Sequence, residues 1–307
     1  MFFSVFSRIA IIFIILLVGA LARWRKILTQ ETTEGLCRIA IEVTLPFLYF
    51  YSLSSHINRQ LLSSVWTFPI FAIALTFASY FIGRLICFPL KLNPNQRSSF
   101  LFLATFPNYG FLAIPLIFAL FGEEGLMMIV MFNLGITFLY WTFGVSILSS
   151  SAGKSLRPFK NLLNNATVAL VLGLIVGVSS FKIPQVILEA SKIIGNASIP
   201  LALIVIGSIL AQTNVKKAVS YRTISTLVFC RLILVPGLVV LAINIFDGLP
   251  RMLSAIIVLQ AAMPSASTTP ILTKRFGGDS ELAASGVFFT TLLSIITVPL
   301  FLSLALR

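Results

Sequence analysis

Two proline-containing segments carry the polar side chains from which a binding site could be built. The first contains Pro107, Asn108, Tyr109 and Gly110, and it interrupts an apolar run over residues 99–121. Because each proline removes a backbone donor and disrupts the preceding turn, it frees carbonyls that hydrocarbon cannot satisfy. Such a break survives only where protein packs around it or where it faces a wet cavity. The segment therefore predicts a site within the membrane.

A second proline break lies far along the chain and carries a similar set of small and polar residues. Its residues are Pro264, Ser265, Ala266, Ser267 and Thr268. Breaks of this kind expose half-helix ends, and the N–H groups and positive dipole of an N-terminus attract an anion. Two interrupted spans in corresponding halves of a chain indicate the substrate site of a transporter. The alternative is a pair of proline kinks whose freed carbonyls are capped by Ser and Thr side chains.

Four further polar residues lie inside apolar runs and are candidates for ion coupling. Glu42 is the only carboxylate clearly inside such a run, and an ionisable side chain at that depth is a functional hypothesis by default. It could carry a proton, or it could form a structural i, i+4 pair with Arg38. Asn133, Asn196 and Gln260 could line a cavity, or each could form an interhelical hydrogen bond.

Two arginines also fall inside the expected spans. Arg84 is expected to extend its side chain towards the cytoplasmic interface, because a long cationic side chain can reach water from within a helix end. For Arg231 the sequence leaves both options open, interface and substrate contact.

The composition is that of a membrane protein. Hydrophobic residues make up 58% of the 307 residues, charged residues only 10%, and the mean hydropathy is +1.03. A soluble domain carries about 25% charged residues. The net charge of +13 is explained by basic loops on the cytoplasmic side, so nucleic acid is not an expected partner. No nucleotide-binding loop, metal-ligand cluster or nucleophile–base pair is visible, so we expect neither an enzyme nor a cofactor or metal site.

Apolar runs bounded by polar clusters predict an all-α polytopic membrane protein with ten transmembrane helices. The expected spans cover roughly residues 5–22, 35–54, 64–89, 98–121, 125–149, 162–181, 186–211, 221–245, 252–274 and 281–305. The longest polar stretch follows span five. We therefore expect two five-helix halves, residues 1–150 and 151–307, with broken helices as spans four and nine.

The distribution of charge and proline predicts that the two halves are inverted repeats. Most Lys and Arg residues lie in the loops after spans one, three, five, seven and nine, which places both termini on the non-cytoplasmic side. An odd number of spans per half then gives the halves opposite orientations. Pro46 in span two matches Pro200 in span seven, and Glu42 and Asn196 each lie four residues before these prolines.

Several segments resemble the auxin efflux carrier family. Pro107–Pro115 is similar to the family's Gly-Asn-x-Gly-Phe-x-Gly-x-Pro segment, with Pro107 and Ala113 where glycines are usual. The second-span Leu45-Pro46 motif, the ninth-span segment Met263–Ala266 and the last-span segment Ser294–Leu300 are also similar. The resemblance runs nearly end to end. The plant exporters' long cytoplasmic insert is absent, so the chain looks more like the compact prokaryotic members, including malate–malonate permeases.

This resemblance implies an architecture and a cargo. Ten helices would form two inverted repeats whose broken fourth and ninth helices cross near the midplane. Spans one, two, six and seven would form a scaffold, and the other spans a mobile transport domain. Cargo would be a small organic anion, auxin-like or a mono- or dicarboxylate, and a homodimer would fit the family.

The function expected from these features is secondary transport of a small organic anion across the cytoplasmic membrane by alternating access. Transport could be coupled to protons or driven by the membrane potential. One rival is a sodium-coupled symporter of the same fold, which could bind the ion through carbonyls and hydroxyls. A cation–proton antiporter is disfavoured, because residues 97–121 and 252–271 contain no acidic residue near the breaks. Another rival is a membrane sensor that binds ligand without moving it.

Overall fold

Helices form every regular element of the described structure. The computed structural model describes residues 2–152, 162–179, 181, 183–213, 220–245 and 248–305. Over these ranges, the one β-type pairing is an isolated bridge between Pro107 and Ser265. The middle of the polar stretch that joins the two expected halves, and the basic loop residues Lys154 and Lys216, lie outside the described residues. The prediction of an all-α chain is thus confirmed for the described residues.

The first half of the chain contains helices that begin and end close to the expected apolar runs. They are α1 (Phe2–Trp24), α2 (Gln30–Ile39), η1 (Ala40–Thr44), α3 (Leu45–His56), α4 (Arg59–Val65), α5 (Phe68–Cys87), η2 (Phe88–Leu90), α6 (Pro94–Thr105), α7 (Ala113–Leu139), η3 (Tyr140–Gly144), α8 (Val145–Ser149) and η4 (Ser150–Ala152). The described helices of the second half are α9 (Asn165–Val178), α10 (Gln185–Asn196), α11 (Ser198–Gln212), α12 (Tyr221–Phe229), η7 (Cys230–Leu234), α13 (Val235–Ile245), α14 (Arg251–Ala262), α15 (Thr269–Phe276) and α16 (Ser280–Ala305).

Length and hydropathy identify a multi-pass membrane protein. Within the described ranges, seven continuous helical stretches are long and apolar enough to cross a membrane: Phe6–Trp24, Gln30–His56, Arg59–Leu90, Ala113–Ser149, Gln185–Gln212, Tyr221–Ile245 and Ser280–Ala305. Two shorter apolar helices, Asn165–Val178 and Arg251–Ala262, lie between them. The stretch Ala113–Ser149 is kinked at Gly122, whose φ of 63° is a conformation that side chains with a Cβ rarely adopt. The kink lies where the sequence places the turn between spans four and five.

Three of the long stretches contain a π-helical turn. The turn η1 joins α2 to α3, η3 joins α7 to α8, and η7 joins α12 to α13. A π-turn shifts the register of the side chains that follow, and such turns recur at functional sites. Two of the three, η3 and η7, carry side chains that contact the broken helices described below.

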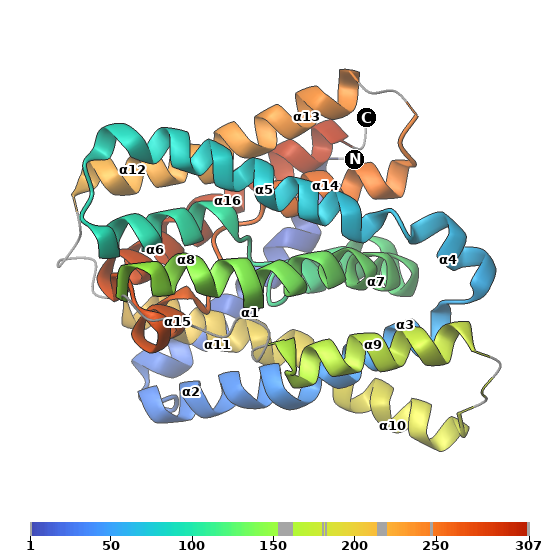
Figure 1. The fold of residues 1–307 in the computed structure, drawn as a ribbon. Helices are drawn as coiled ribbons and strands as arrows, with labels where there is room; N and C mark the ends of the chain where they lie inside the picture. Colours follow the sequence, from blue (N-terminus) through green and yellow to red (C-terminus); the bar gives the residue numbers. More distant parts are fainter. Residues whose placement is uncertain are drawn as a thin grey trace.

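The helices pack in two groups. In Figure 1, α2, α3, α9, α10 and α11 lie in the lower part and α5, α12, α13 and α14 in the upper part, while α1 crosses from one part to the other. In one group α1 packs along α11, while α3 packs against α9 and α10. The backbones approach closely here, since a Cβ on Gly19 would overlap the backbone of Ile204 and one on Gly207 would overlap that of Leu16. In the other group α5 packs on α6 and α7, and α16 packs on α14, α15 and α6.

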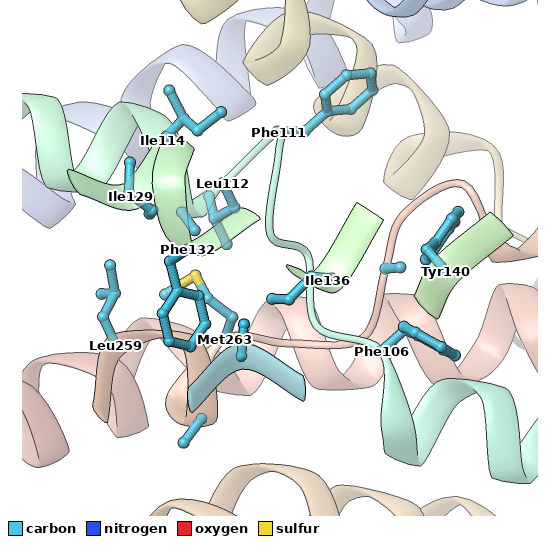
Figure 2. Packing of buried hydrophobic residues seen from close by; sticks show 14 of the residues in the cluster. Phe106, Phe111, Leu112, Ile114, Ile129, Phe132, Ile136, Tyr140, Leu259 and Met263 are labelled. Atoms are coloured by element: carbon cyan, nitrogen blue, oxygen red, sulfur yellow. The ribbon is translucent and has the colours of Figure 1, made fainter. Parts of the chain in front are cut away.

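The most completely buried side chains lie around the two proline breaks. Phe102, Leu103 and Phe106 are fully buried on one side, and Leu259 and Met263 on the other. Figure 2 shows the two unwound segments passing one another, with the side chain of Phe106 beside Tyr140 and that of Met263 near Phe132. Non-helical backbone is therefore enclosed in protein, as a low-dielectric environment requires.

Candidate functional site

The two broken helices meet at their unwound segments. We call residues Phe106–Leu112, between α6 and α7, the first break, and Met263–Thr268, between α14 and α15, the second break. The backbone N–H of Asn108 donates to the carbonyl of Pro264 (2.7 Å), and the N–H of Ala266 donates to the carbonyl of Phe106 (3.0 Å). The bridge is antiparallel, so the two segments cross in opposite directions. The structure thus joins the two segments that contain the nine predicted residues, with direct contact between residues 106–108 and 264–266.

Each break begins with a proline that leaves one helical carbonyl without its donor. Pro107 cannot donate to the carbonyl of Leu103, nor Pro264 to that of Gln260, because proline has no N–H. The hydroxyl of Ser265 donates to the Leu103 carbonyl (2.9 Å), and the guanidinium of Arg231 donates through Nη2 to the Gln260 carbonyl (2.9 Å). Both orphaned acceptors are therefore satisfied by side chains from other segments.

Arg231 is the charged residue at this crossing. It lies in η7, only 1% of its surface is exposed, and it contacts both broken helices. Besides the bond to Gln260, its Nε donates to the Met263 carbonyl (2.9 Å) and its Nη1 to the Ala104 carbonyl (3.4 Å). All three acceptors belong to the C-terminal ends of α6 and α14, where the helix dipole concentrates negative charge. Sequence reasoning left this role open.

Two buried amides connect the breaks to each other. Gln260 donates through Nε2 to Asn133 Oδ1 (2.9 Å), and Asn133 donates through Nδ2 to the carbonyl of Tyr109 (3.1 Å). Neither amide side chain is exposed. Of the two options that the sequence allowed for Asn133 and Gln260, the structure therefore contains the interhelical hydrogen bond.

The first break retains polar atoms without a partner in the described structure. Asn108 accepts the Phe111 N–H on its Oδ1 (3.2 Å), but its Nδ2 is buried without an acceptor. The hydroxyls of Tyr49 and Thr137 are also buried and form no hydrogen bond within 3.5 Å in the described part of the chain, although each has a polar neighbour, Asn133 for Tyr49 and Tyr109 for Thr137. Tyr49 faces this break, because a Cβ placed on Gly110 would lie 4.0 Å from its hydroxyl. Since nearly all buried polar groups are paired, these atoms are exceptions that need an explanation.

The second break is held by an aromatic hydroxyl that the sequence did not point out. Tyr140, in η3, forms a 2.6 Å hydrogen bond with the hydroxyl of Thr268. Its ring also makes edge contacts with Phe106 and Tyr109, at centroid distances of 5.2 and 5.4 Å. The one sequence signal for Tyr49 and Tyr140 is that each is a tyrosine inside an otherwise apolar run.

In the described structure, Glu42 and Asn196 form no hydrogen bond or ion pair with either break. Glu42 is in η1 with its side chain exposed, and its backbone carbonyl accepts Asn165 Nδ2 (2.8 Å). Arg38 is also exposed, and the one ion pair within the described residues joins Lys192 and Glu123 (3.8 Å) instead. Asn196 ends α10, half-buried, with its Oδ1 unpaired.

The described residues contain no cluster of three or more His, Cys, Asp or Glu side chains able to hold a metal ion. The side-chain chemistry of the crossing is that of amides, hydroxyls and one guanidinium. These groups bind and orient polar ligands by hydrogen bonding and charge. A separate cleft of about 330 Å³ opens between α5, α6 and α8, lined among others by Arg97 and Ser98 at the start of α6, the opposite end from the break.

Comparison with known proteins gives one consistent result. The family model described as "Membrane transport protein" matches residues 4–302. An uncharacterized transporter of Methanocaldococcus jannaschii is 24% identical over 301 residues, covering 95% of this chain and 96% of the relative. An uncharacterized transporter of Methanothermobacter thermautotrophicus is 26% identical over 293 residues, covering 94% of each chain. The likeness therefore extends over both breaks and nearly all of the chain.

Proposed function

The chain belongs to this family of membrane transport proteins, the auxin efflux carrier family, and on that premise we propose that it is a secondary transporter of a small organic anion. Transport would proceed by alternating access across the cytoplasmic membrane. The observation that carries the proposal is the antiparallel crossing of two broken helices beside a buried, unpaired amide donor, Asn108 Nδ2. Sites at which discontinuous helices meet are where secondary transporters bind their substrates.

The chemistry around the crossing favours an anion. Asn108 Nδ2 is a donor, and the hydroxyls of Tyr49 and Thr137 can donate as well. Helices α7 and α15 begin directly after the two breaks, and helix N-termini present positive dipole ends. Arg231 adds a full positive charge within the same buried region. A carboxylate would therefore meet donors and positive potential here.

We further propose the predicted architecture of ten crossings in two inverted repeats, residues 1–150 and 151–307. Two observations support it. The breaks cross in opposite directions, and the contact of α1 with α11 (spans one and seven) has a counterpart in the contact of α9 with α3 (spans six and two). In each, a glycine lies against the facing backbone: Gly19 against Ile204 and Gly173 against Phe50. The two packing groups support a scaffold of spans one, two, six and seven and a mobile transport domain of the remaining spans. Both termini would lie on the non-cytoplasmic side, and two copies would form a dimer.

Coupling is a separate part of the proposal. Proton coupling through Glu42 would need that carboxylate to face a partner or a wet path, because its side chain is exposed on η1. Transport driven by the membrane potential needs no such residue. The cargo class, an auxin-like anion or a mono- or dicarboxylate, is what the family resemblance implies, and the donors of the first break support an anion in general.

The test combines ligand binding with flux. Purified protein is screened by thermal unfolding against monocarboxylates, dicarboxylates, indole acids, amino acids and a cationic amine. We expect a carboxylate to raise the unfolding midpoint and to be moved in liposomes. In the variant Asn108→Ala, we expect binding to weaken about tenfold or more, because one buried donor to a charged group contributes about 1.5–3 kcal/mol. Asn95→Ala is the matched control, since Asn95 is exposed in the first turn of α6.

Two results would contradict the proposal. If only neutral or cationic compounds stabilised the protein, the anion assignment would be wrong. If a carboxylate stabilised the protein but no flux occurred in either direction, with or without a proton gradient or membrane potential, the chain would be a sensor and not a transporter.

A further inference from the structure

The carbonyl oxygens around Arg231 form the kind of site that binds a monovalent cation. The carbonyls of Ala104, Gln260 and Met263 come from the C-terminal ends of two different helices and converge on one guanidinium. Half-helix C-termini and unwound carbonyls are the ligands with which transporters of broken-helix architecture coordinate sodium or protons. In this chain a covalently attached cation lies at the centre of those oxygens.

Each of these carbonyls is available because of a break. The Gln260 carbonyl has lost its helical donor to the missing N–H of Pro264. The Ala104 carbonyl has lost the N–H of Asn108, which donates to Pro264 instead. The Met263 carbonyl belongs to the residue that leaves α14 in extended conformation (ψ 143°). Without a donor, these three carbonyls would be unpaired acceptors in the protein interior, which would cost free energy of folding.

The charge of Arg231 is balanced by these dipoles and not by a carboxylate. Within the described residues, the one ion pair is between Lys192 and Glu123. Arg231 is 1% exposed, and all three of its guanidinium nitrogens donate to main-chain oxygens. An arginine that served only in a salt bridge would not need three carbonyl oxygens around its guanidinium. A bound cation does need such a set of oxygens.

We propose that Arg231 is a tethered cation that occupies, from within the chain, a carbonyl site at which a free coupling ion would otherwise bind. The positive charge at the crossing is then permanent. It offsets the negative ends of α6 and α14, which would repel an anion at the first break. Resting on the proposed function, this further implies that substrate uptake does not need sodium.

The decisive experiment replaces the side chain and restores its charged part from solution. In Arg231→Ala we expect a lower unfolding midpoint. Guanidinium ion at about 10 mM should recover about half of that decrease, because it binds the emptied site by mass action. Urea at the same concentration, which is neutral and of similar shape, should recover nothing. Sodium or potassium should stabilise the variant in a saturable manner and leave the unsubstituted protein unchanged, with choline chloride holding the ionic strength constant.

Arg84→Ala is the matched control, because Arg84 is an exposed arginine of the first half whose guanidinium contacts only the Tyr80 hydroxyl (3.2 Å). Guanidinium should not raise its midpoint. If Arg231→Ala does not fold, Arg231→Lys serves instead. It keeps the charge but not the three-way geometry, so we expect an intermediate midpoint that does not respond to sodium.

The outcomes separate this inference from the proposed function. Lost stability in Arg231→Ala without recovery by guanidinium, sodium or potassium would reduce Arg231 to a structural hydrogen-bond donor and overturn the inference. Saturable stabilisation of the unsubstituted protein by sodium would overturn it as well. Neither measurement uses a substrate, so failure to find a transported carboxylate would count against the proposed function alone.

Discussion

The two breaks resemble each other in sequence and differ in chemistry. In the second break, the Ser265 hydroxyl donates to Leu103, its N–H donates to the Thr290 hydroxyl (3.2 Å), and Thr268 bonds Tyr140. In the first break, Asn108 keeps a buried donor without a partner. The second break thus has more of its own polar groups paired within the chain, although Gln260 Oε1, near the end of α14, is also buried without a partner among the described residues.

This difference suggests a division of work between the repeats. A buried polar group left unpaired costs free energy, so it persists where a ligand repays that cost. A group that is already paired in the chain has little left to offer a ligand. We therefore assign recognition mainly to the first break and positioning mainly to the second. The predictions below test this assignment, beginning with the largest expected effect.

Asn133 is the side chain that connects the two breaks, and its removal should cost the most. In Asn133→Leu, Gln260 Nε2 loses its acceptor and the Tyr109 carbonyl loses its donor, both in the protein interior. Leaving two buried groups unpaired should lower the free energy of unfolding by about 2–3 kcal/mol. Denaturation in SDS–detergent mixtures measures this directly.

Thr137→Val is the control for that variant, one helical turn further along α7. The Thr137 hydroxyl is buried and unpaired, so replacing it by a methyl should leave stability unchanged or raise it. If Thr137→Val lost as much free energy of unfolding as Asn133→Leu, α7 would tolerate no substitution on this face. The stability measurement would then not report on the connection between the breaks.

Replacing Ser265 tests whether the second break stabilises the C-terminal end of α6. In Ser265→Ala the Leu103 carbonyl, already deprived of a helical donor by Pro107, loses its remaining one. We expect a loss of about 1–2 kcal/mol, within the range for a buried acceptor left unpaired and near the upper end for membrane hydrogen bonds. Ser267→Ala is the control, since the described structure contains no hydrogen bond from that side chain. Equal losses in the two variants would contradict a specific role for Ser265.

Sequence patterns were sufficient to locate both breaks, because proline and glycine disrupt a helix wherever they occur. They were not sufficient for the partners of the freed carbonyls. Ser265 donates to the carbonyl that Pro107 frees in the other break, and Arg231 donates to the one that Pro264 frees. Ten spans were predicted, and seven continuous helical stretches of the described residues are long and apolar enough to cross a membrane. The remaining expected runs are divided by a break or contain a shorter helix. For example, residues 98–121 contain α6, the first break and the start of α7.

The partners that come from distant helices could not be predicted in the same way. Arg231, Tyr49 and Tyr140 reach the breaks because of how their helices are rotated, and two of them lie in π-turns that shift the register. The hydrophobic periodicity of a sequence does not reveal where a π-turn inserts one extra residue. For Glu42 the expected depth in the membrane suggested a role in proton coupling, but its side chain is exposed on η1.

Tyr140 should have a modest effect on stability and a clearer one on the geometry of the second break. Tyr140→Phe removes the 2.6 Å bond to Thr268 and keeps the ring contacts with Phe106 and Tyr109. We expect a loss of about 0.5–1 kcal/mol, the usual contribution of a membrane side-chain hydrogen bond. Thr268→Val should give a similar loss, and the double variant should not exceed either single one by much. Additive losses would show that the two hydroxyls act independently.

Gly110 should have the smallest effect on stability and a large one on binding. A methyl group at this position would lie 3.8 Å from Leu45 Cδ2 and 4.0 Å from the Tyr49 hydroxyl, which are ordinary van der Waals contacts. In Gly110→Ala we therefore expect a free energy of unfolding within about 0.5 kcal/mol of the unsubstituted protein. Carboxylate binding should weaken, because the methyl would occupy space between the Tyr49 hydroxyl and the first break.

Gly135→Ala provides the contrast, since a methyl there would overlap the carbonyl of Pro69 and should destabilise the α5–α7 contact severely. Unchanged binding in a stable Gly110→Ala protein would place the ligand elsewhere and remove the main difference between the breaks. Weakened binding with unchanged stability would instead place the ligand at the first break, beside Gly110.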